Sequence, residues 1–330
     1  MQPSNTLKKL SEKLNLSIST VSRALKNHPD ISEATKTRVK ELAEILEYEP
    51  NSFAIQLRTN KSTEIGIIVP AVSNFFYDSF ISAVEEDARL HGYSVLIMQS
   101  GESAEVEIEN LKSLKNHRIA GIFVSVTTQT NNITPFLKLQ DAGIPVIFFD
   151  RVPEFEACNK VCLSDDMAAN IAAKELIAKN KKNVLGLFGH PSLTICKNRA
   201  ASFIKTFETF APQTKLHIEF ASDEDAKKVT KNYLGRKDKP DAVFCMGDLL
   251  LIGAMQAIFD LNLNVPNDVG VITISNGFIP ALFNPKITYV ETSGYKLGKL
   301  AFSRMLECLS GKTFIRKLYI DSFLMPGGSL

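Results

Sequence analysis

The sequence predicts two structural classes in one chain: an all-α helix-turn-helix segment at the N-terminus, then a two-lobed α/β part with doubly wound parallel sheets. Within residues 1–48, apolar residues recur at helical spacing in three short stretches that follow good capping residues. From residue 64 onward, short apolar runs alternate with amphipathic stretches. Buried strands that alternate with helices are typical of parallel α/β sheets. There are eleven such apolar runs, which is more than a single open sheet usually contains, so we expect two similar lobes.

The size and charge of the chain set limits on what it can be. It has 330 residues, of which 45% are hydrophobic and 22% are charged, so it is a globular protein with room for two or three full cores. The net charge is only +2, and residues 1–60 carry nine Lys and Arg against seven Asp and Glu. Any affinity for nucleic acid must therefore come from the placement of the cations rather than from an overall basic field.

The sequence also argues against several classes of protein. The N-terminus has no apolar export segment and no run of eighteen apolar residues occurs, so we expect a cytoplasmic protein without a membrane partner. Five scattered cysteines favour reduced thiols. The five histidines include no pair at metal-ligand spacing, and we find no nucleophile-elbow or phosphate-loop motif. We therefore expect no enzyme activity, no metal and no cofactor.

The second helix of the N-terminal segment is the most informative stretch. Ser17 is a good N-cap for a helix that begins at Ile18. At about 100° per residue, Val21, Ala24 and Leu25 share one face with Ile18 beside them, and the opposite face holds Ser19, Ser22, Arg23 and Lys26. Hydroxyls and cations on one face suit the DNA major groove, where Arg pairs with guanine and Ser or Thr with bases or phosphates. Taken alone, the pattern also fits an ordinary surface helix.

The neighbouring helices favour the nucleic-acid interpretation. Asn5 or Thr6 can cap a first helix whose leucines form one stripe, and only residues 15–17 separate it from the second helix. Two short helices joined by about three residues have helix-turn-helix geometry. Ser32 can cap a third helix, in which the buried stripe is Val39, Leu42, Ala43 and Leu46. Residues 51–58 can then form a helix of about two turns, too short to be stable alone in water.

The α/β part is predicted element by element. We expect strands at 64–70, 93–98, 119–125, 145–149, 160–163, 183–188, 215–220, 241–246, 268–274, 287–291 and 316–321. We expect helices between them, for example at 76–91, 104–117, 165–180, 195–210, 223–235, 248–262 and 294–310.

Polar and aromatic side chains follow the carboxyl ends of these strands, where open α/β sheets bind ligands. We expect a ligand site at Ser73, Phe75, Phe76, Tyr77, Ser125, Asp150, Arg199, Asp248, Ser275 and Asn276. Rings that stack and charged groups that bind hydroxyls suit a small polar ligand. Two of these residues have an alternative interpretation, because Asp150 fits a structural cap or a bridge between lobes and Phe75 fits a core position.

The N-terminal run TLKKLSEKLNLSISTVSRALKNHPDISEATKTRVKELAEILEYEPNSFAIQLRTNKS closely resembles the headpiece of the lac-repressor (LacI/GalR) family of bacterial transcription regulators. The specific part is STVSRAL, followed by the third helix and then EPN. This resemblance implies a helix-turn-helix headpiece at 1–48, a hinge helix and linker at 49–60, and a periplasmic-binding-protein-like domain at 61–330. It implies an N-lobe at about 61–160 and 292–320, and a C-lobe at about 161–291 and 321–330.

The resemblance also implies a function. We expect a homodimer that binds a pseudo-palindromic operator and represses transcription, with affinity controlled by a small-molecule effector between the lobes, most simply a sugar or sugar derivative. The expected DNA contacts are Ser17, Ile18, Ser19, Thr20, Ser22, Arg23, Lys26, Asn27, Thr35, Arg38, Asn51, Ala54 and Leu57. Leu57 would wedge into the minor groove from a hinge helix that forms only on DNA.

For the ligand site, the resemblance supports Phe76, Tyr77, Asp150, Arg199 and Asp248. The chain departs from the family at Ile274-Ser275-Asn276, where an aspartate commonly binds ligand hydroxyls. Ser275 can bond a hydroxyl but carries no charge, so the effector differs from a common sugar or Arg199 and Asp248 contribute more. The alternative class is a small-molecule binding or transport receptor with an accessory N-terminal domain. Such a receptor needs an export signal, and a capped DNA-reading helix occupies that place here.

Overall fold

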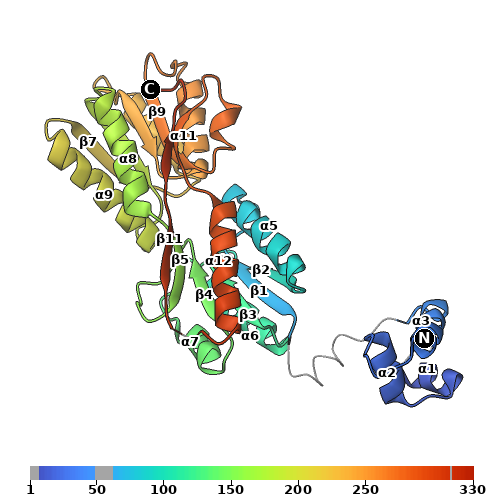
Figure 1. Cartoon of the computed structure of the whole chain (residues 1–330). Helices are drawn as coiled ribbons and strands as arrows, with labels where there is room; N and C mark the ends of the chain where they lie inside the picture. The colour runs from blue at the N-terminus through green and yellow to red at the C-terminus, as the bar shows by residue number, and fades with distance from the viewer. Residues whose placement is uncertain (1–6, 49–61, 313) are drawn as a thin grey trace. The chain divides into compact units, whose positions relative to one another are not determined.

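The computed structural model describes residues 7–48, 62–312 and 314–330. They form two compact units that divide after Ser62, and each is described by itself (Figure 1). The predicted hinge helix at 49–60, with Asn51, Ala54 and Leu57, lies outside the described residues.

The first unit consists of three helices, α1 (Leu7–Leu14), α2 (Ile18–Leu25) and α3 (Glu33–Ile45). Its small core contains Leu10, Val21, Ala24 and Val39, all fully buried. Both predicted N-caps are present, because Ser17 Oγ accepts from the Thr20 N–H at 3.1 Å and Ser32 Oγ from the Thr35 N–H at 3.3 Å. The connection between α1 and α2 turns at Asn15, whose φ of 56° lies in the left-handed region that asparagine tolerates.

The second unit contains two six-stranded sheets, with orders β11-β5-β4-β3-β1-β2 and β12-β10-β9-β8-β6-β7. The strands of the first sheet are all parallel: β1 (Glu64–Val69), β2 (Ser94–Gln99), β3 (Gly121–Val124), β4 (Val146–Phe149), β5 (Asn159–Leu163) and β11 (Lys317–Ile320). Those of the second are β6 (Asn183–Phe188), β7 (Lys215–Phe220), β8 (Ala242–Cys245), β9 (Gly270–Ser275), β10 (Thr288–Glu291) and β12 (Phe323–Met325). Only β12 is antiparallel to its neighbour. This arrangement confirms the predicted fold class.

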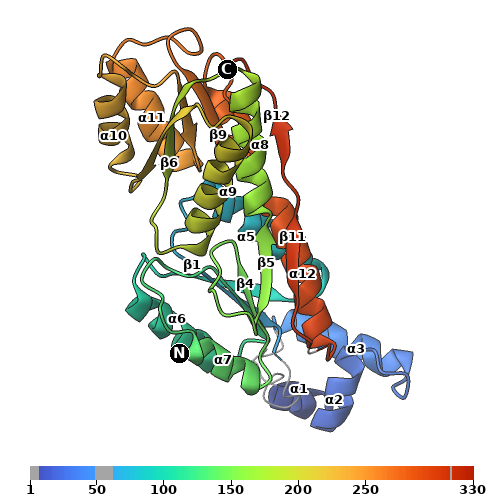
Figure 2. The same ribbon diagram turned by 90° about the vertical axis from the view of Figure 1, so that its left-hand side faces the viewer.

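Helices cover both faces of the first sheet (Figure 2). One face packs against α5 (Phe75–Leu90) and α12 (Gly294–Leu309), and the other against α6 (Ala104–Asn116) and α7 (Thr134–Asp141). Helix α12 approaches α5 closely because a Cβ at Gly298 would lie 2.7 Å from the Phe80 carbonyl oxygen. This packing fixes the start of α5, which carries Phe76 and Tyr77.

The second sheet carries its own helices, which pack in pairs: α8 (Asp165–Ala178) with α9 (Thr194–Phe210), and α10 (Ala226–Leu234) with α11 (Asp248–Asp260). A 3-10 turn, η1 (Pro280–Leu282), precedes β10. Together these elements enclose one continuous apolar core. The chain therefore has the two lobes that eleven apolar runs predicted.

The chain crosses between the lobes three times, after β5, after β10 and after β11. Strand β5 pairs with both β4 and β11 in the first sheet, so the first crossing follows Leu163. The boundary expected near residue 160 falls inside this strand. The prediction did not name β12, which has only three residues, or α7, which begins without a side-chain cap.

Candidate ligand cavity and nucleic-acid-reading helix

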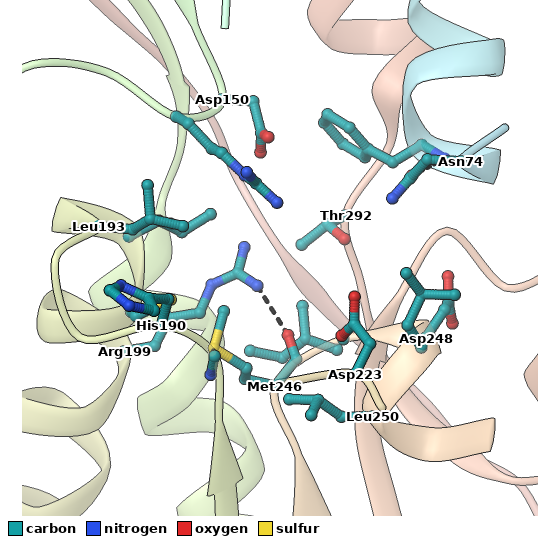
Figure 3. A pocket seen from close by; sticks show the side chains of 18 of the residues that line it. Asn74, Asp150, His190, Leu193, Arg199, Asp223, Met246, Asp248, Leu250 and Thr292 are labelled. Atoms are coloured by element: carbon teal, nitrogen blue, oxygen red, sulfur yellow. Dashed lines mark hydrogen bonds between the residues drawn. The ribbon is translucent and has the colours of Figure 1, made fainter. Parts of the chain in front are cut away.

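A cavity of about 350 Å³ lies between the two lobes, at the carboxyl ends of both sheets (Figure 3). The connection after β4 contributes Asp150 and Arg151, and the segment after β6 contributes His190. From the second sheet, Met246 follows β8 and Asn276 follows β9. Strand ends of both lobes therefore supply the polar lining, as expected for this type of fold.

Seven of the expected ligand-site residues line this cavity: Phe76, Tyr77, Asp150, Arg199, Asp248, Ser275 and Asn276. The other three do not belong to its lining. Ser125 is fully buried behind it and hydrogen bonds to the Tyr77 hydroxyl at 2.9 Å. Ser73 is exposed before α5, and Phe75 is 41% exposed, with its ring 4.7 Å from that of Phe278. The core alternative for Phe75 therefore does not hold.

Asp150 is held by buried polar neighbours. The Tyr77 hydroxyl donates to Asp150 Oδ2 at 2.9 Å, and the backbone of Asp150 adopts a left-handed φ of 56°. Burial raises the pKa of the Asp150 carboxyl, while the adjacent Arg151 opposes that rise. Burial also raises the pKa of the Tyr77 phenol, so Tyr77 stays neutral and donates its proton.

Arg199 is 5% exposed, and two hydrogen bonds and an ion pair hold it within the protein. Its Nε and Nη2 lie 2.9 Å from Asp165 Oδ1, and its Nη1 donates to the Met246 carbonyl at 2.8 Å (Figure 3). Burial raises the pKa of Asp165 to about 6 even though Arg199 opposes the shift. The guanidinium therefore joins the first turn of α8 to the end of β8 as well as facing the cavity.

Arg151 forms an ion pair with Glu102, a residue that the prediction omitted. Glu102 Oε2 also accepts from the Thr128 N–H at 2.9 Å. Burial would raise the pKa of Glu102, but the charge of Arg151 and the Thr128 N–H lower it overall. Glu102 is consequently ionised at neutral pH, and its carboxylate pairs with the Arg151 guanidinium.

Asp248 occupies the first turn of α11 and faces the cavity. Its Oδ1 atom is buried and, among the residues that the structure describes, has no hydrogen-bond partner. Burial raises the pKa of Asp248 to about 6, and the nearby Ser275 hydroxyl opposes part of the shift. A buried acceptor without a partner is costly to the folded protein, so it marks a place where a ligand can donate a hydrogen bond.

Several lining residues were absent from the expected set. Among them are Asn74, Glu102, Arg151, His190, Asp223 and Thr292. Glu102, Asp223 and Thr292 follow β2, β7 and β10, so the strand-end rule could have found them had it been applied to every strand. No comparable signal in the sequence indicates that Asp165 pairs with Arg199.

Hydrogen bonds connect the two lobes around the cavity. Ser192 Oγ donates to the Thr128 carbonyl at 2.9 Å, and Asn276 Nδ2 donates to the Phe75 carbonyl at 3.2 Å. Lys197 pairs with Glu154 at 2.8 Å. These few polar contacts allow the lobes to change their angle at modest cost, because they are individually weak.

In the N-terminal unit, the polar face of α2 is available to a partner. Ser17, Ile18, Ser19, Arg23, Lys26 and Asn27 are exposed, while Thr20 and Ser22 are partly exposed. Arg23 has only a loose contact with Asp30, at 3.9 Å. In α3, Arg38 is exposed and Thr35 is partly exposed beside its cap Ser32. The opposite face of α2 is packed in the core, so this helix presents hydroxyls and cations on a rigid support.

The described part of the chain offers neither a metal-binding cluster nor a membrane-spanning helix. Residues 7–48, 62–312 and 314–330 contain no cluster of three His, Cys, Asp or Glu side chains arranged to hold a metal ion. Over the same residues, each helix is too short or too polar to span a bilayer.

A DNA-reading helix on one unit and a ligand cavity on the other define a DNA-binding regulator that responds to a small molecule. A family model described as a periplasmic binding protein domain matches residues 65–313, and one described as bacterial regulatory proteins, lacI family, matches residues 6–51. The chain belongs to the lacI family of bacterial transcription regulators, as its headpiece sequence indicated.

Similar proteins and structures agree with this assignment. The repressor PurR of Vibrio atlanticus (strain LGP32) is 25% identical over 317 residues, and that of Vibrio vulnificus (strain CMCP6) is 26% identical over 318, with 95% of each chain covered in both cases. The structure of the Lac repressor bound to ONPG in the repressed state has a TM-score of 0.89 at 20% identity, covering 99% of this chain and 100% of that chain. These relatives are transcription regulators rather than enzymes.

Proposed function

We propose that this regulator is a repressor that binds a pseudo-palindromic operator as a homodimer, and that a carbohydrate effector in the cavity between the lobes sets its operator affinity. The observation that carries the proposal is helix α2, whose apolar side is buried while Ser19, Arg23 and Lys26 are exposed. The repressor names of the relatives support the direction of control. The headpiece disfavours the alternative of a transport receptor, and a regulator of genomic DNA works in the cytoplasm.

The operator is read by one headpiece per half-site, with α2 in the major groove. Ile18, Ser19, Thr20 and Arg23 contact base edges in this proposal, and the other polar residues set the register on phosphates. Ser17, Ser22, Lys26, Asn27, Thr35 and Arg38 are the residues proposed for that second role. Asn51, Ala54 and Leu57 act from a hinge helix that forms on the DNA.

The effector occupies the cavity lined by Phe76, Asp150, Arg199, Asp248 and Asn276. A volume of about 350 Å³ suits a small ligand, and the mixture of a ring, apolar side chains and polar strand ends suits a carbohydrate. One solved structure of similar fold, a periplasmic binding protein/LacI regulator from Alkaliphilus metalliredigens QYMF, holds D-xylulofuranose (TM-score 0.70, 20% identity, 81% of this chain and 99% of that chain covered). A ligand in contact with both lobes changes the angle between them, and so the spacing of the hinge segments.

Selection of DNA by the purified full-length protein tests this function. Fragments from a genomic library are captured, sequenced and compared, and the affinity of the best fragment is measured at several salt concentrations. We expect enrichment of a twofold-symmetric site, with affinity that falls as salt rises because phosphate contacts release counterions. Equal binding to all fragments at every salt concentration would contradict the proposal.

A further inference from the structure

The lining of the cavity carries an excess of acidic groups. Its carboxyl groups are Glu102, Asp150, Asp223 and Asp248, whereas its guanidinium groups are Arg151 and Arg199. The only other ionisable side chains among the lining residues that the structure describes are His190, Tyr77 and Cys196, and burial keeps the latter two neutral by raising their pKa. The lining therefore holds four carboxyl groups against two guanidinium groups, and burial raises the pKa of three of those carboxyl groups, Asp150, Asp223 and Asp248.

Neither guanidinium group is a free cation for a ligand, because each already pairs with a carboxylate of the protein. Arg199 binds Asp165 and the Met246 carbonyl, and Arg151 binds Glu102. A ligand phosphate or carboxylate that approached either guanidinium would meet a cation whose charge an adjacent carboxylate already balances, and would have to share its N–H groups with that carboxylate. Displacing Asp165 from Arg199 would leave a buried carboxylate unpaired, which is strongly unfavourable.

Among the described residues, two carboxyl groups of the C-lobe, Asp223 and Asp248, form no ion pair, although the charge of Arg151 opposes the rise that burial causes in the pKa of Asp223. Within the same residues, Asp248 Oδ1 is buried without any hydrogen-bond partner. Both residues line the same cavity, together with Thr292 (Figure 3). The N-terminus of α11 supplies positive potential here, but Asp248 itself lies in that first turn and uses it.

A ligand that donates hydrogen bonds would satisfy the carboxyl groups of Asp223 and Asp248. A carboxylate accepts bonds from hydroxyl or ammonium groups, and a second negative charge close to it in a cleft of low dielectric is repelled. Part of the remaining lining is apolar or already bonded: Leu193, Leu250 and Met246 line the cavity, and Asn276 bonds to Phe75 and Phe278. Such side chains fit the carbon face of a small polyol.

We propose that the effector is a neutral or amino-substituted polyol without negative charge, whose hydroxyl or ammonium groups donate to Asp248 and Asp223. This inference rests on the proposed function, since it takes the cavity as the effector site. It excludes sugar phosphates and sugar acids, which are otherwise natural candidates for a carbohydrate-responsive regulator.

Matched ligands that differ only in charge test the inference. The full-length protein is titrated calorimetrically with pentoses, hexoses and hexitols, and with the amino-substituted, phosphorylated and oxidised forms of each. We expect at least one neutral or amino form to bind, and its phosphate or acid to bind at least tenfold more weakly. An anionic form that binds as tightly as its parent would overturn the inference, and so would a panel in which no neutral or amino form binds.

Two carboxamide variants test the residues, and a third variant provides the control. Asp248→Asn and Asp223→Asn keep the shape of each side chain but remove its charge. Each variant should therefore reduce, at least threefold, the ratio of the affinity for the neutral ligand to the affinity for its anionic form. Glu224→Gln removes a charge next to Asp223 from a residue that does not line the cavity, and should leave this ratio unchanged. If all three variants keep the wild-type ratio of affinities for neutral and anionic ligands, Asp248 and Asp223 do not have the proposed roles. Melting curves recorded without ligand establish that each variant is folded.

Operator binding separates a failure of this inference from a failure of the proposed function. The affinity for the selected operator is measured without ligand and then with each ligand that binds. If a phosphorylated sugar binds best and shifts operator affinity, the charge inference is wrong and the regulator function stands. If no fragment is preferred in the absence or presence of any ligand, the proposed function itself is wrong.

Discussion

Arg199 shows how strongly the role of one side chain depends on its neighbours. The sequence placed it at the ligand site, and the structure adds that Asp165 and the Met246 carbonyl already bind its guanidinium. Replacing Arg199 by Ala would leave Asp165 buried and unpaired, with a cost in stability as well as any cost in ligand affinity. Asp248 and Asp223, which have no such partners, are therefore sharper probes of effector binding.

At the residue scale, Arg23 and Arg38 should respond differently to truncation. Arg23→Ala removes a proposed base contact, so we expect the preference for the operator over unrelated DNA to fall by about ten- to a hundredfold. Arg38→Ala removes a proposed phosphate contact, so affinity should weaken similarly for all sequences, and the salt dependence should fall by about one counterion. Competition binding at several salt concentrations measures both effects. An unchanged sequence preference in Arg23→Ala would remove Arg23 from the reading face.

Glu107 gives a prediction about pH. It is fully buried in the first turn of α6, accepts from the Thr127 N–H at 3.2 Å and from the Thr130 hydroxyl, and burial raises its pKa to about 7 from 4.5. The folded protein thus holds this proton more tightly than the unfolded chain. Its contribution to stability is complete below the unfolded pKa and is lost as pH rises through about 7.

Glu107→Gln should remove the loss of stability that the wild type shows as pH rises through about 7. Relative to the wild type, the free energy of unfolding of the variant should rise between pH 5 and pH 8, by about 2 kcal/mol. Urea unfolding at the two pH values measures the change. Glu109→Gln, an exposed residue of the same helix, serves as the control and should follow the wild type. A Glu107→Gln variant with the wild-type pH dependence would contradict the burial argument.

At the element scale, local signals determined what could be predicted. Helix α2 was predictable because Ser17 caps it and its apolar side chains recur at helical spacing, and the central strands were predictable because they are continuous apolar runs. Strand β12 was not, because three partly exposed residues gain strand geometry only by pairing with β10. Local signals were also insufficient for the ligand site. The ends of the predicted strands indicated Asp150 and Asp248, but the pairing of Arg151 with Glu102 depends on the tertiary fold.

The hinge helix gives the prediction at this scale. Leu57 lies outside the described residues, and its role as a minor-groove wedge rests on the family resemblance. Leu57→Ala keeps helix propensity while removing the wedge, and Leu57→Gly also lowers propensity by about 1 kcal/mol. We expect Leu57→Ala to weaken operator binding at least tenfold and to reduce DNA bending, since unstacking by the wedge is what the bend requires. Fluorescence resonance energy transfer between the ends of an operator fragment reports the bend, and equal bending by wild type and variant would refute the wedge.

At the scale of the whole molecule, the central claim is a coupling between two distant sites. The cavity lies between two lobes joined by three chain crossings and a few polar contacts, among them Ser192 with Thr128 and Asn276 with Phe75. In the proposed function, a ligand that favours one angle between the lobes biases the hinge helix expected at residues 49–60, which would be too short to be stable alone. Because such coupling is an equilibrium property, DNA must change ligand affinity by the same factor as ligand changes DNA affinity.

The most direct test measures this reciprocity on the full-length protein. Operator affinity is determined with and without a saturating polyol that binds the cavity, and the affinity for that polyol is determined with and without saturating operator. We expect two equal factors that both differ from one, of about five- to a hundredfold. Operator affinity that stays the same when the cavity is filled would contradict it.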